Sequence, residues 1–321
     1  MQFFYKDLYC DGNAEIETTG VFCVITINEY LDNILSEFKA YATSGVELCL
    51  LKNVHFDGGR LPNYSDIHIQ QLYLLRYAYA YGFEYKQMYK SLWHRVKSSH
   101  TLRVTSIGCG SMIDYWALTQ VVPENCSIRY TGIDAIDWSY RFDPRPQDNV
   151  SFLNTDVVSL FDSADVLTSD VYIFPKSISE FSHNDIQILG NSLSKKLPAG
   201  QTVYLLFSLR TDEWNLELDM RKTKILFDAM VGSGYETSDI SNGVTVLNRD
   251  YQEKKIREVD SSFLHPQNVV RFLREDLHEC CIKYVENWKH CKSDCERRLS
   301  WWPILTCQQA QWQLFEFTKE E

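Results

Sequence analysis

The sequence predicts an α/β fold around a mostly parallel, doubly wound sheet, and three observations support this prediction. A β-branched run at 103–107 ends on Gly108 and Gly110. An amphipathic segment follows, and a second apolar run ends on Asp134. Further apolar runs at 150–156, 169–176 and 202–208 are separated by segments long enough for helices. This alternation is typical of a parallel sheet with helical crossovers.

The glycines and the acid at the ends of the first two strands predict a nucleotide site. Glycine at 108 permits a tight turn off the strand, and glycine at 110 lets backbone N–H groups approach a ligand. Asp134 ends the next strand, where a carboxylate accepts hydrogen bonds from both ribose hydroxyls. A dinucleotide site needs a third glycine where this chain has Ile113. A nicotinamide oxidoreductase is therefore the less favoured interpretation.

The motif Ile-Gly-Cys-Gly at 107–110, with Gly-Ile-Asp at 132–134, resembles the cofactor loop of class I S-adenosylmethionine-dependent methyltransferases. The resemblance covers roughly residues 98–248 and the extreme C-terminus. It implies a Rossmann-like, seven-stranded sheet whose antiparallel last strand lies next to the fifth. We expect the sixth strand at 243–247 and the last at 311–318.

The resemblance also implies which residues hold the cofactor. Residues at the end of the first strand face the methionine part, and those after the second and third strands face the ribose and adenine, with Ile136 and Trp138 as further candidates beside the adenine. Phe174 ends the fourth strand, next to the methyl group. The expected cofactor-binding residues are Ser106, Gly108, Cys109, Gly110, Asp134, Ala135, Asp156, Val157 and Phe174.

One position departs from the family pattern. Class I methyltransferases usually carry an acid two residues before the first glycine, and here that residue is Ser106. The methionine ammonium then needs another partner, for which Asp114 is a candidate. Arg76 is a candidate for the methionine carboxylate, and with Tyr77 it is expected on the substrate side of the site.

The segment after the fourth strand is expected to face the methyl acceptor. Some nucleic-acid amino-methyltransferases carry an Asn or Asp before a proline here, and this chain has none before Pro175. Transfer to adenine N6 or cytosine N4 is therefore disfavoured. Glu180 is a candidate proton acceptor and Lys176 a candidate for holding an acidic substrate. Pro175 and Ser177 are expected to contact the substrate.

Four segments are expected along the chain. Residues 1–97 form an accessory region with a strand or hairpin at 15–27, a helix capped by Asn28, a strand at 46–54, a loop at 57–64 and a Tyr-rich helix at 65–97. Residues 98–248 form the cofactor-binding domain, in which we expect helices at 112–121 and 222–230 and one capped near Ser182. Residues 249–305 form a helical, cysteine-rich insertion, and residues 306–321 return to the sheet.

Five tyrosines recur every fourth residue in the long helix, at positions 73, 77, 81, 85 and 89. Such a row drifts round the helix, so it cannot all face one core. Some of the rings are expected to border a cavity, although amphipathic packing is the favoured interpretation.

Composition restricts the class of protein. The chain has 321 residues, 45% hydrophobic and 23% charged, and a net charge of −11. Clustered Lys and Arg dominate phosphate affinity, so nucleic acid is not favoured as a partner. No apolar run reaches the length needed to span a bilayer, and we expect a cytoplasmic protein without a membrane partner.

Five of the ten cysteines lie in the last 42 residues. The pair His278 and Cys281 and the pair Cys291 and Cys295 have helical spacing that would suit a zinc site. Structural zinc sites more often use Cys-x2-Cys loops, so buried, apolar packing of these thiols is favoured over zinc.

The sequence thus predicts a methyltransferase that uses S-adenosylmethionine and acts on a small molecule or a protein side chain. Two alternatives remain open. One is an RNA methyltransferase whose basic, aromatic insertion contacts the nucleic acid. The other is a non-catalytic interaction protein that keeps the fold and uses the insertion to hold a partner.

Overall fold

The computed structural model describes residues 26–56, 62–96, 101–210, 212–238, 240–241, 244–245, 252–254, 266–303 and 307–320. The expected strand at 15–27 lies outside these residues except for Thr26 and Ile27, which begin a helix. Most of the expected loop at 57–64 also lies outside them.

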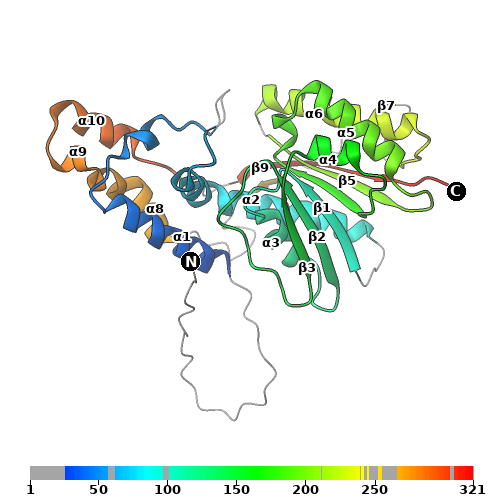
Figure 1. The fold of residues 1–321 in the computed structure, drawn as a ribbon, viewed down its shortest axis with the longest axis horizontal. Helices are drawn as coiled ribbons and strands as arrows, with labels where there is room; N and C mark the ends of the chain where they lie inside the picture. The colour runs from blue at the N-terminus through cyan, green and yellow to red at the C-terminus, as the bar shows by residue number, and fades with distance from the viewer. Residues whose placement is uncertain are drawn as a thin grey trace, which may run out of the picture.

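Five parallel strands and one antiparallel strand form the central sheet (Figure 1). The strands are β1 (Thr101–Ile107), β2 (Ser127–Asp134), β3 (Asn149–Asn154), β4 (Val171–Pro175), β5 (Val203–Leu209) and β9 (Cys307–Phe317). Their order is β3-β2-β1-β4-β5-β9, and β9 runs antiparallel to β5. The expected α/β architecture and the place of the last strand are confirmed.

The sixth strand is not where the sequence predicted it. The short strand β7 (Val244–Thr245) lies within the predicted 243–247. It pairs with β6 (Ile240–Ser241) in a separate two-stranded sheet. The edge position beside β9 is taken instead by the three-residue β8 (Gln252–Lys254). Residues 244–245 do form a strand, as the sequence predicted, but this strand pairs with the adjacent segment and not with the main sheet.

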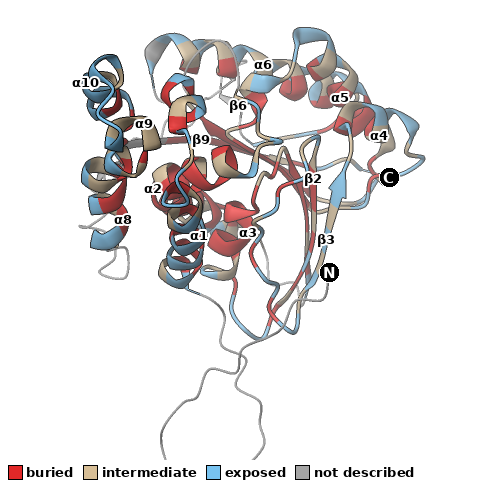
Figure 2. Ribbon diagram, turned by 60° about the vertical axis from the view of Figure 1, so that its left-hand side comes forward, coloured by how far each residue is buried: buried red, intermediate tan, exposed pale blue. Residues whose placement is uncertain are grey.

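Helices cover both faces of the sheet, as expected for a doubly wound fold (Figures 1 and 2). On one face, α4 (Val157–Ser163), α5 (His183–Lys196) and α6 (Glu213–Gly232) bury one apolar cluster. On the other face, α1 (Ile27–Ala42), α2 (Ile67–Arg95) and α3 (Ile113–Thr119) bury a second cluster. Alternate strand residues divide between the two: Ile107 lies in the first cluster and Val104 in the second.

The helix starts follow side-chain caps. Ser182 and Asp185 form the capping box expected at the start of α5. α1 is capped by Thr26 and Glu29 rather than by the predicted Asn28. α6 begins at its cap Asp212, well before the predicted 222. The predicted strand at 46–54 is wrong, since Leu48–Asn53 is a 3-10 helix, η1, in which Leu48 and Leu51 are buried one turn apart.

Short helices lie between β8 and β9 and pack against α1 and η1. They are α8 (Gln267–Arg271), the π-turn η3 (Phe272–Asp276), η4 (Leu277–Cys280), α9 (Ile282–Val285) and α10 (Lys289–Arg298). Figure 1 shows them beside α1, away from the sheet. Phe272 meets Phe38 of α1 edge to face, with ring centroids 6.1 Å apart. Within the described residues no helix is long and apolar enough to cross a membrane.

Candidate functional site

The glycine turn after β1 is held against the end of β2. The backbone N–H groups of Gly108 and Cys109 donate to the carbonyl of Ile133, at 2.8 and 3.2 Å. Gly108 and Gly110 have φ values of +68° and +54°, which favour glycine. A Cβ on Gly108 would lie 2.5 Å from the Cβ of Ser177. The turn therefore brings the ends of β1, β2 and β4 together.

Asp134 is bound to this turn through both carboxylate oxygens. Oδ2 accepts from the Gly110 N–H and Oδ1 from the Ile136 N–H, each at 2.8 Å. Burial raises the pKa of Asp134, and hydrogen bonds from the backbone of Ile136 and Gly110 and from the Trp138 side chain act against that rise. A carboxylate has about four acceptor sites, so these three donors do not use them all. The carboxylate is therefore oriented by the backbone and still able to accept from a ligand.

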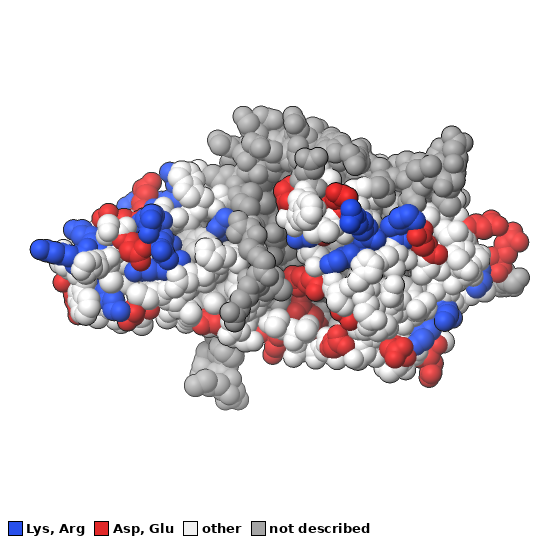
Figure 3. Space-filling model, turned by 90° about the horizontal axis from the view of Figure 1, so that it is seen from above, with Lys and Arg blue, Asp and Glu red and all other residues white. Residues whose placement is uncertain are grey.

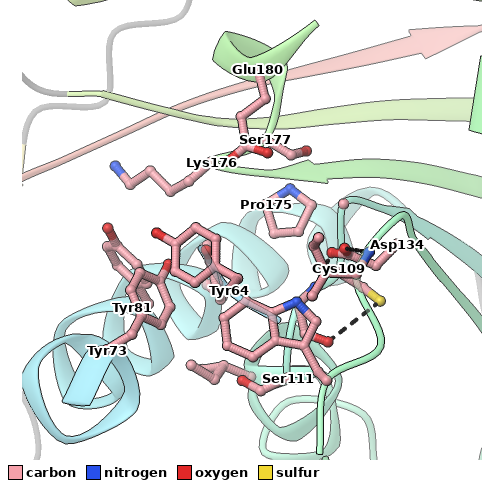
Figure 4. Close-up of a pocket in the computed structure, with 16 residues that line it drawn as sticks. Tyr64, Tyr73, Tyr81, Cys109, Ser111, Asp134, Pro175, Lys176, Ser177 and Glu180 are labelled. Atoms are coloured by element: carbon pink, nitrogen blue, oxygen red, sulfur yellow. Dashed lines mark hydrogen bonds between the residues drawn. The ribbon is translucent and has the colours of Figure 1, made fainter. Parts of the chain in front are cut away.

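A pocket lies over this loop (Figure 4), and its empty space, open mouth included, is about 590 Å³. It is formed by three parts of the chain: the α2 region, the ends of β1 and β2, and the segment after β4. Its lining residues are Tyr64, Tyr73, Tyr81, Tyr85, Gly108, Cys109, Gly110, Ser111, Ile113, Asp134, Ile136, Trp138, Pro175, Lys176, Ser177 and Glu180.

Aromatic rings make one wall of the pocket. The Tyr64 ring lies 5.3 Å from that of Trp138 and 5.4 Å from that of Tyr73, centroid to centroid. Tyr73 in turn lies 5.5 Å from Trp138. Burial raises the pKa of Tyr64, Tyr73, Tyr81 and Tyr85 above the ordinary value. Their hydroxyls therefore stay protonated, and the wall carries no charge.

Lys176 is held by a buried acid. It follows β4 with a φ of +61°, and its Nζ lies 2.7 Å from Oε1 of Glu84 on α2. Ser208 of β5 donates to the same oxygen at 2.5 Å. Burial raises the pKa of Glu84, and the Lys176 ammonium acts against that rise. The ion pair links α2 to the sheet and occupies the lysine.

Glu180 faces the pocket from η2 (Ile178–Glu180). Protein surrounds its carboxyl although the side chain remains open to solvent at the pocket mouth. Desolvation, together with the nearby charge of Asp134, raises the pKa of Glu180 to about 7, while Arg210 and Lys222 act against the rise. This value suits a group that exchanges a proton near neutral pH.

The pocket brings together ten of the residues considered for the site from the sequence. Four come from the cofactor loop and the acid of β2, two from the segment after β2, and four from the segment after β4: Gly108, Cys109, Gly110, Asp134, Ile136, Trp138, Pro175, Lys176, Ser177 and Glu180.

The structure places the other predicted cofactor residues elsewhere. Asp156 caps α4, accepting from the backbone N–H groups of Val158 and Ser159 at 3.4 and 2.9 Å. Val157 and Phe174 are buried in the core cluster beneath α4 and α5. Ser106 is fully buried within β1, and Ala135 is exposed without lining the pocket.

The candidates for the methionine end are also directed away from the pocket. Asp114 is buried, and its carboxylate accepts from the hydroxyls of Tyr130 at 2.9 Å and Tyr89 at 3.3 Å. Arg76 stacks over the rings of Tyr77 and Trp301, 5.1 Å from each centroid. None of these residues lines the described pocket. Asp114, on α3, and Arg76 and Tyr77, on α2, make these internal contacts instead.

Sequence reasoning did not select Tyr64, Ser111 or Ile113 for the site. Tyr64 precedes α2 and reaches the pocket only through the fold, so no local signal marks it. The tyrosine row gave a partial signal: three of its members line the pocket, whereas Tyr77 and Tyr89 do not.

The cysteines of the insertion are packed in apolar surroundings. Cys281 and Cys295 are completely buried, and Cys280 and Cys291 are partly buried beside the same core. In the part of the chain that the structure describes, no three His, Cys, Asp or Glu side chains are placed to hold a metal ion. The side chain of Cys307 lies outside that part.

The fold is α/β, and the pocket lies at the carboxyl ends of parallel strands. The arrangement agrees with the resemblance to class I methyltransferases. No family model and no curated protein matches the sequence.

Several solved structures show limited similarity. One is the mitomycin 7-O-methyltransferase MmcR, with a TM-score of 0.31 and 14% sequence identity. The match covers 48% of this chain and 48% of that protein. The [4+2]-cyclase SpnF has a TM-score of 0.38 and 14% identity over 73% of this chain and 81% of its own. Phosphoethanolamine N-methyltransferase 2 of Haemonchus contortus has a TM-score of 0.33 and 10% sequence identity. The match covers 73% of this chain and 53% of that protein. The chain thus spans about half the length of two of these proteins. Similarities this low define neither the fold nor the activity of this chain.

Proposed function

We propose that this chain is an S-adenosylmethionine-dependent methyltransferase acting on a small molecule or a protein side chain. One observation carries the proposal. The Cβ-free turn at Gly108 and Gly110 and the carboxylate of Asp134 meet at the shared end of β1 and β2, inside a pocket. A ribose diol is the ligand group best matched to such an oriented carboxylate.

The residues present fit the nucleoside part of this cofactor. Asp134 keeps an acceptor site for a ribose hydroxyl beside its bonds to Gly110, Ile136 and Trp138, and Ile136 and Trp138 supply apolar surface where an adenine ring would lie. Asp156 does not contribute in this arrangement because its oxygens cap α4. The adenine amino group would then rely on backbone groups near the ends of β2 and β3.

Methyl transfer from a sulfonium is an in-line displacement, and the cofactor supplies the methyl group and the leaving sulfur. The chain supplies position and a dry site. Asp134 and Gly110 hold the nucleoside end, and the ring wall of Tyr64, Tyr73 and Trp138 excludes water from the other side.

The RNA alternative finds little support in the insertion. Lys283 pairs with Glu47 at 2.5 Å, and Arg297 and Arg298 both pair with Asp294. Figure 3 shows basic and acidic side chains mixed over the end of the molecule that carries α10. Phosphate binding needs clustered, unneutralised cations.

Two further expectations accompany the proposal. One is a cytoplasmic location. The other is the division of the chain into an accessory region (1–97), a cofactor-binding domain (98–248), an insertion (249–305) and a returning strand (306–321). Limited proteolysis followed by mass spectrometry tests these boundaries, and cutting within 98–248 before the junctions contradicts them.

Calorimetric titration tests the function. S-adenosylmethionine and S-adenosylhomocysteine are expected to bind the full chain at micromolar concentration, and NAD is not. Asp134→Ala is expected to weaken binding at least about tenfold, because a charged hydrogen-bond acceptor facing the ribose is lost. Asp137→Ala is the matched control, since Asp137 is exposed and pairs with Arg141 outside the pocket. No binding of either sulfur nucleoside contradicts the proposal and favours the non-catalytic alternative.

A further inference from the structure

The charges that line the pocket are few, and their partners can be identified. Among the lining residues that the structure describes, the charged ones are Asp134, Lys176 and Glu180. Lys176 is neutralised by Glu84. Asp134 is bound by the cofactor loop and assigned above to the ribose. Glu180 is thus the charge left to meet a second ligand.

No hydrogen bond or ion pair holds the Glu180 carboxylate among the described residues. The two cations nearest to it are engaged elsewhere. Arg210 binds Asp219 through Nε at 3.0 Å and Nη2 at 2.6 Å. Lys222 donates to the carbonyls of Ile178, Ser179 and Phe181. The carboxylate therefore lacks a cationic partner of its own inside a concave site.

The opposite wall of the pocket favours the same kind of ligand. The rings of Tyr64, Tyr73 and Trp138 present aromatic surface to the pocket. Figure 4 shows the tyrosines on the α2 side and Glu180 across the pocket from them. Aromatic faces attract cations, and an unpaired carboxylate attracts them more strongly. An anionic ligand would meet no unpaired cation among the described lining residues.

We propose that the methyl acceptor is an amine that enters this pocket as an ammonium ion and binds Glu180. This inference rests on the proposed methyltransferase function and names its substrate class. Glu180 accepts one proton from the ammonium and becomes neutral. The freed nitrogen lone pair forms the new N–C bond while the S–C bond of the sulfonium breaks and its electron pair stays on sulfur. The product leaves as the methylated ammonium, and the neutral Glu180 releases its proton to water, which restores the carboxylate.

The proton step is consistent with the surroundings of Glu180. Its pKa of about 7 means that a substantial fraction of the carboxyl is ionised at neutral pH and that it holds a proton readily. The charged groups that act on it are Asp134, Arg210 and Lys222. The phenols of Tyr64, Tyr73 and Tyr85 face it as well and stay protonated.

Two probes of equal shape and opposite charge test the inference. 2-Phenylethylamine and 3-phenylpropionate are titrated into the full chain, with and without S-adenosylhomocysteine. We expect the amine to bind about tenfold or more tightly than the carboxylate, because a hydrogen bond to a charged group is worth that much. Glu180→Gln, which keeps the size of the side chain, is expected to remove this preference. Its affinity for S-adenosylhomocysteine should stay within about twofold of the original.

Glu217→Gln is the matched control, since Glu217 is exposed on α6 and pairs with Arg221 outside the pocket. It is expected to leave both the preference and the cofactor affinity unchanged. Tighter binding of the carboxylate, equal binding, or binding of neither probe overturns the inference. A loss of S-adenosylhomocysteine affinity in Glu180→Gln also overturns it, because Glu180 would then serve the methionine ammonium. Failure of the proposed function is recognised separately, by absent nucleoside binding to the unchanged chain.

Discussion

At the scale of single residues, the buried carboxyl of Asp114 makes stability depend on pH. Burial raises its pKa from the ordinary 3.8 to about 6, and the hydroxyls of Tyr130 and Tyr89 act against the rise. Between about pH 4 and 6, Asp114 is therefore still protonated in the folded state but already ionised in the unfolded state. Stability attributable to this group falls as pH rises through that window, by at most about 3 kcal/mol.

Urea unfolding of Asp114→Asn across pH 4–7 checks this. The unchanged chain is expected to lose stability relative to the variant as pH rises. Asp156→Asn is the control, and it should change the pH dependence of stability in the opposite direction, because hydrogen bonds from Ser159 lower the pKa of Asp156. Stability from Asp156 is present at higher pH and is lost as pH falls. Parallel pH profiles of the unchanged chain and Asp114→Asn would contradict the argument.

At the scale of elements, β9 joins the end of the chain to the core through its aromatic face. Phe315 lies 4.9 Å from Phe227 of α6 and 6.2 Å from Phe207 of β5, centroid to centroid. Phe315→Ala is expected to lower the free energy of unfolding by about 3–5 kcal/mol, because the cavity lies among packed rings. Glu320→Ala, at an exposed position just after the strand, is expected to change it by less than about 0.5 kcal/mol. Urea midpoints measure both, and a cost below about 1 kcal/mol for Phe315→Ala counts against this packing.

At the scale of the whole molecule, residues more than 200 positions apart form one lobe beside the sheet domain. Asn268 donates to Asp32 at 2.8 Å, and the Ile282 N–H donates to the Val46 carbonyl at 3.2 Å. Phe38→Ala removes the ring that meets Phe272. Hydrogen exchange is expected to accelerate in both α1 and α8, while β1 to β5 keep their protection.

Ser36→Ala, an exposed position on the same helix, is the control and is expected to leave exchange unchanged. Acceleration confined to α1 would show that the two segments open independently, contrary to this prediction.

The sequence alone was enough to predict the alternating strands and helices of residues 101–209, the Ser182 cap and the antiparallel last strand. These features follow from local periodicity, glycine and capping chemistry, which nearby residues determine. It was also enough to bring Gly108, Gly110 and Asp134 to one edge, because parallel strands end together. The predicted strand at 46–54 and the sixth strand at 243–247 failed because short apolar runs take their conformation from their packing partners.

Only the tertiary structure decided which charges the pocket offers. Nothing near Lys176 in the sequence indicates that Glu84, on a helix 92 positions earlier, neutralises it. Likewise, Asp219 and the carbonyls of η2 engage the cations that would otherwise pair with Glu180. The sequence by itself therefore determined the class of fold and the strand ends at which the pocket lies. The charge facing the acceptor depended on long-range pairs, because electrostatic partners are set by distance in space and not by separation along the chain.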